Sequence, residues 1–253
     1  LAAEQVAAWL RDFMRAPNGG FYTSQDADLQ QGSKAHDYFA LDRAQRLQRG
    51  LPRIDRNQYA DANGKAIEGL VTLYQVTGDK AHLGLAVGAL DWVLRNRRAE
   101  QGGFRHAETD IAGPYLADSL YIGRALLAIH EASGQEVWLR QAGELADFIG
   151  VRFRHSGGGL AAAVDNGTPL QPLPQLDQNI HAARFLYTLA SRTAEPRHLD
   201  LADHVMRYLA TPEIATSRLT DAGILLADVA RRQVASKQLL TLLPITAAMG
   251  GDA

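Results

Sequence analysis

The chain has 253 residues, of which 46% are hydrophobic and 21% charged, with a formal net charge of −2. This length and composition are typical of a folded domain with a sizeable core, and they exclude a disordered chain. The small net charge argues against a nucleic-acid partner or an anionic membrane surface. The longest apolar run, 239–251, is shorter than the ~20 residues that a membrane span needs.

Cysteine is absent from the chain. Its absence excludes a disulfide framework, a thiol nucleophile and Cys-ligated zinc. The compartment stays open, with the cytoplasm favoured.

Apolar residues recur at helical spacing through most of the chain. In chain order the pattern predicts helices at 1–15, 36–48, 60–77, 79–97, 116–132, 135–152, 178–191, 196–210 and 219–236. Brief stretches after glycine turns, such as 19–22 and 102–105, are the segments with an extended pattern. The chain starts inside the first helix without a signal-peptide pattern, so we expect sequence to be missing upstream.

Three of these helices repeat one another. Segments 63–74, 119–130 and 179–190 superpose at offsets of 56 and 60 residues, and their apolar columns include Leu70, Leu126 and Leu186. A short polar turn and a second helix follow each segment, and a glycine turn follows two of the three second helices. Repeated helical hairpins of this length predict an all-α fold, an α/α toroid with the first helix of each pair on the inner ring. About twelve helices complete such a ring, so we expect it to be incomplete here.

Acidic and amide residues precede or open the inner helices. They are Asp61 and Asn63, Asp118, and Asp177 and Asn179. Capping of the helix N-termini explains such residues without any other role. In a toroid, however, these helix starts surround one cavity mouth, where carboxylates could perform acid/base chemistry on a sugar.

The loops add further candidates for the same site. His106 follows a glycine turn and suits proton transfer, although a surface histidine without a role fits the pattern too. Asp26 and Asp28 are candidate acid/base groups or simple turn formers. Three tyrosines and a second histidine are candidate substrate contacts, with packing as the alternative for the rings: Tyr22, Tyr115, Tyr121 and His181.

No metal or cofactor site is expected. His198, Asp200, Asp203 and His204 lie close together in the sequence, but they match no ligand spacing and suit a solvated helix face. A phosphate-binding loop and a Gly-x-Ser-x-Gly elbow are both missing.

The string Gly-Gly-Phe-Tyr-Thr-Ser-Gln-Asp-Ala-Asp at 19–28 resembles the signature of the YyaL-like proteins, bacterial relatives of the spermatogenesis-associated thioredoxin-domain proteins. Shorter matches at 61–64, 114–118 and 223–228 extend the resemblance over about 15–228. The family's long insertion after the first string shrinks here to 29–57, and the chain after Asp228 does not match cleanly.

The resemblance implies a toroid similar to N-acylglucosamine 2-epimerases and six-hairpin glycosidases, with a thioredoxin-like domain as its partner. The expected division is a toroid domain at 1–236, lacking that upstream domain and the first hairpins, and a tail at 237–253 whose structure is left open. Two functions follow. The toroid is either a sugar epimerase, isomerase or glycosidase that acts by acid/base catalysis, or a non-catalytic binding scaffold for the redox domain.

Overall fold

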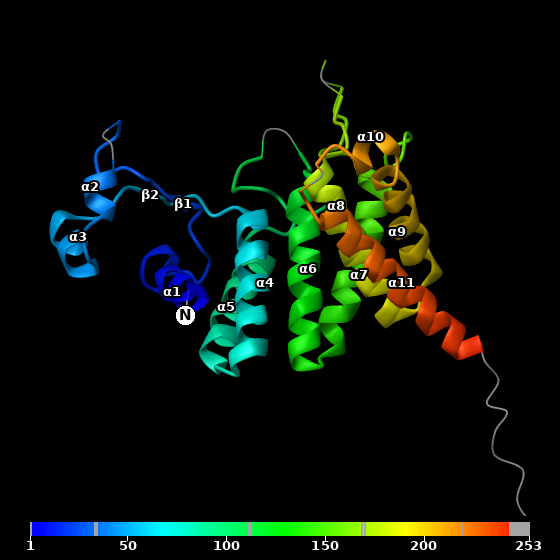
Figure 1. The fold of residues 1–253 in the computed structure, drawn as a ribbon, viewed down its shortest axis with the longest axis horizontal. Coiled ribbons are helices and arrows are strands. Elements are labelled where there is room, and N and C mark those ends of the chain that lie inside the picture. Colours follow the sequence, from blue (N-terminus) through cyan, green and yellow to red (C-terminus); the bar gives the residue numbers. More distant parts are fainter. Residues whose placement is uncertain are drawn as a thin grey trace, which may run out of the picture.

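The computed structural model describes residues 2–32, 35–110, 113–167, 169, 171–218 and 220–242. Three long helical hairpins form most of it (Figure 1). They are α4 (Ala60–Thr77) with α5 (Lys80–Asn96), α6 (Leu116–Ser133) with α7 (Glu136–Phe153), and α8 (Leu176–Thr193) with α9 (Pro196–Leu209). The described part of the chain is mostly helical, and the predicted hairpins are confirmed.

The first helices of the hairpins pack against one another in succession. α4 contacts α6, α6 contacts α8, and α8 contacts α11 (Gly223–Leu242), while each second helix packs behind its own partner. The apolar columns lie in these interfaces, where Leu70, Leu126 and Leu186 are buried. This arrangement fits the inner row of an α/α toroid.

The turns inside the hairpins repeat as well. α4 and α6 both end at a glycine with positive φ, Gly78 (74°) and Gly134 (69°). Ala194 occupies the equivalent place after α8 and adopts the same left-handed conformation, with a φ of 54°. This conformation lets the turn residue's N–H bond the last helical carbonyls, and glycine adopts it without steric cost.

The helices of the N-terminal part differ from the predicted ones. The expected helix 36–48 is two short helices, α2 (His36–Phe39) and α3 (Arg43–Arg49). Asp42 breaks the helix because its side chain accepts a hydrogen bond from Gln45 N while the Gln45 side chain bonds Asp42 N, a complete capping box. The other expected helix, 1–15, is α1 (Ala2–Trp9) continued by the π-helical turn η1 (Leu10–Met14).

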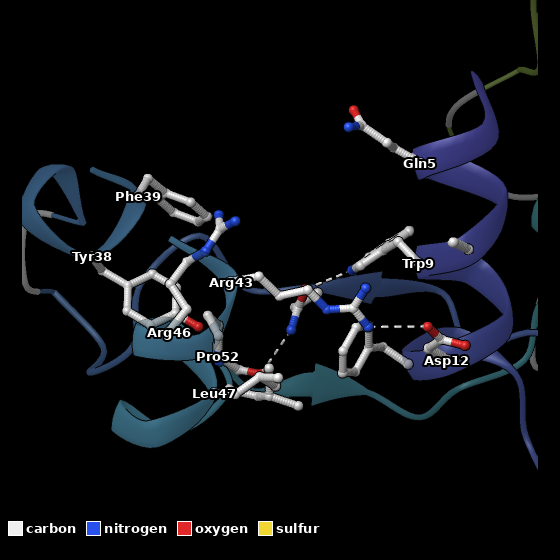
Figure 2. A pocket seen from close by; sticks show the side chains of 13 residues that line it. Gln5, Trp9, Asp12, Tyr38, Phe39, Arg43, Arg46, Leu47 and Pro52 are labelled. Carbon is white, nitrogen blue, oxygen red and sulfur yellow. Dashed lines mark hydrogen bonds and ion pairs between the residues drawn. The ribbon is translucent and has the colours of Figure 1, made fainter. Parts of the chain in front are cut away.

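Two short strands join this part to the hairpins. β1 (Ser24–Gln25) pairs antiparallel with β2 (Ile54–Asp55), in the register Ser24 to Asp55 and Gln25 to Ile54. A pocket lies between α1 and the α2–α3 pair (Figure 2).

The C-terminal part differs from the expectation too. The helix predicted at 219–236 begins at Gly223 and continues to Leu242, so it includes the first residues of the expected tail. An additional short helix, α10 (Pro212–Ala215), precedes it. Leu219 and residues 243–253 lie outside the described residues. None of the described helices is both long and apolar enough to cross a lipid bilayer.

α4 and α6 approach each other closely at Gly64. A Cβ atom at this position would lie 2.6 Å from the backbone carbonyl carbon of Tyr121. We therefore expect Gly64→Ala to destabilise the fold by about 3 kcal/mol, because backbone cannot move aside as a flexible side chain can. Gly69→Ala, on the same helix but with nothing within 4 Å, should instead stabilise it by up to ~1 kcal/mol. Urea unfolding of both variants tests the prediction, which fails if they shift stability alike.

Candidate functional site

His106 lies in the loop between α5 and α6, and its backbone is held on both sides. Its N–H donates to Asp110 Oδ2 at 2.6 Å, and its carbonyl accepts from Ala60 N, the first residue of α4, at 3.1 Å. The imidazole stacks on the Tyr59 ring, with centroids 4.3 Å apart, and meets the edge of Tyr115 at 5.7 Å. These contacts fix the ring at the junction of two inner helices.

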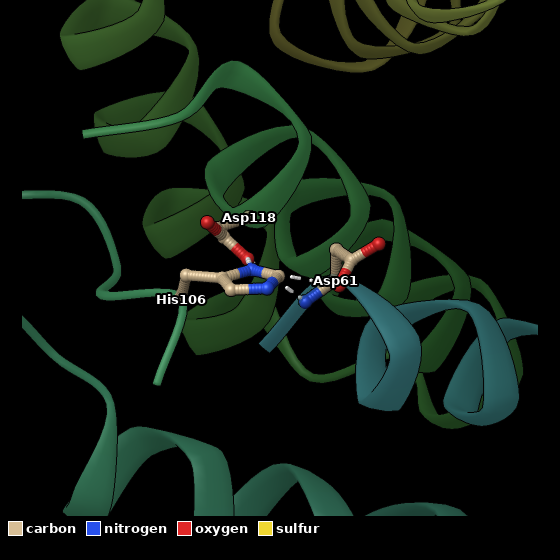
Figure 3. A group of neighbouring side chains, drawn as sticks. All are labelled: Asp61, His106 and Asp118. Carbon is tan, nitrogen blue, oxygen red and sulfur yellow. Dashed lines mark hydrogen bonds and ion pairs between the residues drawn. The ribbon is translucent and has the colours of Figure 1, made fainter. Parts of the chain in front are cut away.

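The His106 ring pairs with a carboxylate from the first turn of α6. His106 Nδ1 lies 2.9 Å from Asp118 Oδ1, and the same oxygen accepts a hydrogen bond from Asp61 N at 3.1 Å (Figure 3). Asp61 adds a second carboxylate, with Oδ1 3.8 Å from His106 Nδ1. The structure thus brings together His106, Asp118 and Asp61, which the sequence places in three separate segments.

The two partners of this pair differ in exposure. Asp118 is fully buried, whereas 34% of the His106 side chain is exposed. Burial raises the pKa of Asp118 to about 6, against the opposing effect of the His106 hydrogen bond. An ionised Asp118 accepts the proton on Nδ1, and in the neutral imidazole this tautomer carries its lone pair on Nε2. Among the described residues, Nε2 has no hydrogen-bond partner.

A polar strip continues from this pair across the inner helices. Lys65 Nζ bonds Asp61 Oδ2 at 2.7 Å and lies 4.3 Å from the centroid of the Tyr121 ring, which meets the His181 ring at 5.5 Å. Lys65, Tyr121 and His181 occupy one repeat column, at offsets of 56 and 60. Equivalent positions therefore form one row on α4, α6 and α8.

Burial shapes the chemistry of this row. It raises the pKa of the Tyr121 hydroxyl and lowers the pKa of His181, with Arg124 adding to the second effect. His181 Nδ1 is buried and has no hydrogen-bond partner among the described residues. One turn farther along, Arg124 binds Glu68 through Nε and Nη2 and donates to the His181 carbonyl.

Asn63 and Asn179 are fully buried and bond backbone groups. Asn179 Oδ1 accepts from Leu160 N, and its Nδ2 donates to the carbonyls of Leu160 and Gln175. Asn63 makes the same three bonds to Phe21 and Tyr59. Each amide therefore joins a glycine-turn loop to the start of an inner helix.

Four other candidates make their contacts outside the pair. Asp26 and Asp28 form a turn, in which Asp28 N donates to Asp26 Oδ1. The Tyr22 ring lies near Arg56, whose guanidinium carbon is 6.0 Å from the centroid. Asp177 is exposed and forms an ion pair with Arg218.

Lys65, Glu68 and Arg124 lie beside these candidates but are not predicted from the sequence. The 56-residue offset carries a signal for Lys65, because it aligns Lys65 with the candidate Tyr121. Ligand atoms of Asp61, His106 and Asp118 all lie within 4.8 Å of one another, a spacing at which they could also hold a metal ion.

No protein-family model matches the chain, and no curated protein does. Solved structures do match. A cellobiose 2-epimerase from Spirochaeta thermophila DSM 6192 is 21% identical with a TM-score of 0.60, and the match covers 83% of this chain and 53% of that one. A D-mannose isomerase is 13% identical with a TM-score of 0.62, over 83% of this chain and 51% of that one.

A third similar structure is the family 76 α-1,6-mannanase from Salegentibacter sp. HEL1_6, at 15% identity and a TM-score of 0.57, over 96% of this chain and 81% of that one. The chain spans about half the length of the first two proteins. At such identities the likeness concerns the fold. The chain therefore has the α/α-toroid fold of sugar epimerases, sugar isomerases and family 76 glycosidases.

Proposed function

We propose that this chain forms part of a sugar isomerase or epimerase in which His106 transfers the proton. The observation that carries the proposal is the hydrogen bond from a partly exposed imidazole to a fully buried carboxylate, Asp118. A buried carboxylate orients the imidazole and stabilises the imidazolium that forms when the ring takes a proton. The fold shared with sugar epimerases and isomerases supports a sugar as the substrate.

In the proposed reaction Nε2 of His106 removes the proton from C2 of a ring-opened aldose. The electron pair left at C2 forms the enediolate with the C1 carbonyl, and the imidazolium then returns the proton. Return to C1 gives the ketose once the hydroxyl proton on O2 has moved to the neighbouring O1 of the enediolate. Return to the opposite face of C2 gives the epimer and needs a second acid, for which His181 is the proposed candidate. Tyr115, Tyr121 and Lys65 are proposed to contact the sugar.

A glycosidase is less consistent with this geometry. Glycoside hydrolysis uses two carboxyl groups that flank the glycosidic bond and reach the substrate. Asp118 is fully buried, and its Oδ1 is occupied by His106 and by the N–H of Asp61. Asp61 is therefore the one carboxylate of this group that could reach a sugar, whereas hydrolysis needs two. This favours proton transfer at carbon over hydrolysis.

The test is proton NMR of the purified chain in D₂O with a panel of mono- and disaccharides that includes N-acetylated sugars. Deuterium is expected at C2 of an epimer or of the recovered aldose, or at C1 of a ketose. Anomeric products from a disaccharide would indicate a hydrolase and contradict the proposal. No exchange with any sugar, in a protein shown to be folded, would favour a non-catalytic binding scaffold, provided that the full-length protein is silent too.

The resemblance of residues 19–28 to the YyaL-like proteins supports a second role beside the first. We propose from it that the toroid works with a thioredoxin-like domain. Asp26 and Asp28 of this string lie in a turn next to the β1–β2 pair, outside the His106 pair, so this segment is free for a structural or docking role. Binding of a separately purified thioredoxin-like domain, lost on Asp28→Ala, is the expected result.

Asp118→Asn should separate stability from activity. The raised pKa means that the folded chain holds the Asp118 proton up to about pH 6, whereas an unfolded aspartate releases it near 3.8. Parent stability therefore falls as pH rises from about 4 to 6, by as much as ~3 kcal/mol, and stays lowered above that range. Asparagine carries no such cost, so the variant should gain stability relative to the parent over this range while losing exchange activity. Urea unfolding at pH 4, 5, 6 and 7 measures the free energy of unfolding of both proteins. An Asp118→Asn variant that is less stable than the parent at pH 7 would contradict the prediction.

A further inference from the structure

The pocket between α1 and the α2–α3 pair lies outside the hairpins and outside the site described above. Its volume is about 460 Å³, within the range of small-molecule sites. Figure 2 shows Trp9 on one side of the space and Tyr38 and Phe39 on the other. Phe13 adds a fourth aromatic ring to the lining.

The polar tips of these rings are already used inside the protein. Trp9 Nε1 donates to Gln25 Oε1 at 3.0 Å, and the Tyr38 hydroxyl donates to the Gly50 carbonyl at 2.9 Å. These bonds hold both rings in place, so the rings offer a ligand their apolar faces and edges. Phe39 is 52% exposed, so much of its ring is open to a ligand. A flat apolar ring is the shape that such walls accommodate.

The charged groups of the lining leave one cation without a partner. Arg43 Nη2 bonds Asp12 Oδ2 at 3.2 Å. The Arg46 guanidinium, in contrast, has no hydrogen bond or ion pair among the described residues, and neither does the Gln5 side-chain amide. Two arginines and one aspartate give the lining a formal charge of +1. An arginine only donates hydrogen bonds, so its complement is an anionic acceptor.

We propose that this pocket binds a small monoanion with a flat apolar ring, such as an aromatic carboxylate. The ring would lie between Trp9 and the Tyr38–Phe39 wall, and the carboxylate would accept hydrogen bonds from Arg46. A sugar fits less well because its hydroxyl groups need several donors and acceptors, and Gln5 and Arg46 are the unpaired polar groups among the described lining residues. This site is independent of the proposed reaction at His106.

Calorimetric titration of the whole chain with 2-naphthoate and with its neutral analogue 2-naphthamide tests the proposal. Naphthoate should bind at least about tenfold more tightly, since a charge-assisted hydrogen bond is stronger than a neutral one. Arg46→Gln should remove this difference by weakening naphthoate alone. Phe39→Ala should weaken both compounds to a similar extent.

Arg49→Gln is the matched control, because Arg49 is an exposed residue of the same helix outside the lining. This variant should leave both affinities unchanged. If Arg46→Gln and Arg49→Gln weaken naphthoate binding equally, the effect comes from general surface charge and the proposed role of Arg46 is wrong. Equal binding of the two compounds, no binding of either at millimolar concentration, or tighter binding of glucuronate than of naphthoate would each overturn the proposal.

Discussion

Replacing His106 with asparagine is expected to slow deuterium exchange at C2 of the sugar by at least about a hundredfold. A positioned general base contributes a factor of about 10²–10⁴, and asparagine cannot take up a proton near neutral pH. Asparagine can still donate a hydrogen bond to Asp118 Oδ1, which now accepts from His106 Nδ1. The buried carboxylate therefore keeps a partner, and we expect the folded chain to persist, as circular dichroism would show.

His36→Asn is the control for this variant. His36 lies on α2 with 94% of its side chain exposed, far in the sequence from the pair and without a role in the proposed reaction. Its exchange rate should equal that of the parent. If His106→Asn exchanges deuterium at the parent rate, another group removes the proton and the proposed role of His106 is wrong. If both histidine variants slow exchange equally, the effect is not specific to the site.

The largest loss of stability is expected from Asn179→Ala. The substitution removes three hydrogen bonds and leaves the N–H and carbonyl of Leu160 buried without their partner. Each unsatisfied buried group costs about 1–3 kcal/mol, so the free energy of unfolding should fall by about 3–5 kcal/mol. Urea unfolding followed by circular dichroism measures the change.

Ser119 offers a graded comparison for this prediction, because it occupies the repeat position between Asn63 and Asn179. Its hydroxyl accepts one hydrogen bond, from Phe104 N at 3.3 Å. Ser119→Ala should therefore cost about 1 kcal/mol, well below Asn179→Ala. A stable Asn179→Ala variant with weakened sugar binding would show that Asn179 contacts substrate, which contradicts the structural role.

Much of the fold could be predicted from local pattern. Helical spacing of apolar residues located the inner and outer helices of three hairpins, since one buried face imposes that spacing whatever the helix packs against. The offsets of 56 and 60 residues located the equivalent positions. The broken helix at α2–α3 could not be predicted from the apolar pattern, because the Asp42–Gln45 capping box competes with a continuous helix only through local hydrogen bonds.

The candidate site was predictable in part. His106, Asp118 and Asp61 were candidates because of their residue types and their places at loops and helix starts. The contact between these three side chains could not be predicted from the sequence. It depends on where the α5–α6 loop crosses the start of α4, and the hydrogen bond from Ala60 N to the His106 carbonyl fixes that crossing. The same signal, an amide at a helix start, marked Asn63 and Asn179, which the structure buries as links between loop and helix.

The sequence by itself determined the all-α hairpin repeat, because periodicity and turn chemistry are properties of neighbouring residues. Tertiary structure alone decided which polar side chains are buried and which keep an atom without a hydrogen-bond partner. Asp118 and His106 are twelve residues apart, yet the packing of α4 against α6 buries the first and leaves the second partly exposed. Burial raises the pKa of the Asp118 carboxyl, because desolvation depends on all the elements that surround a group and not on its own segment. The partial exposure of His106 leaves its Nε2 without a hydrogen-bond partner among the described residues.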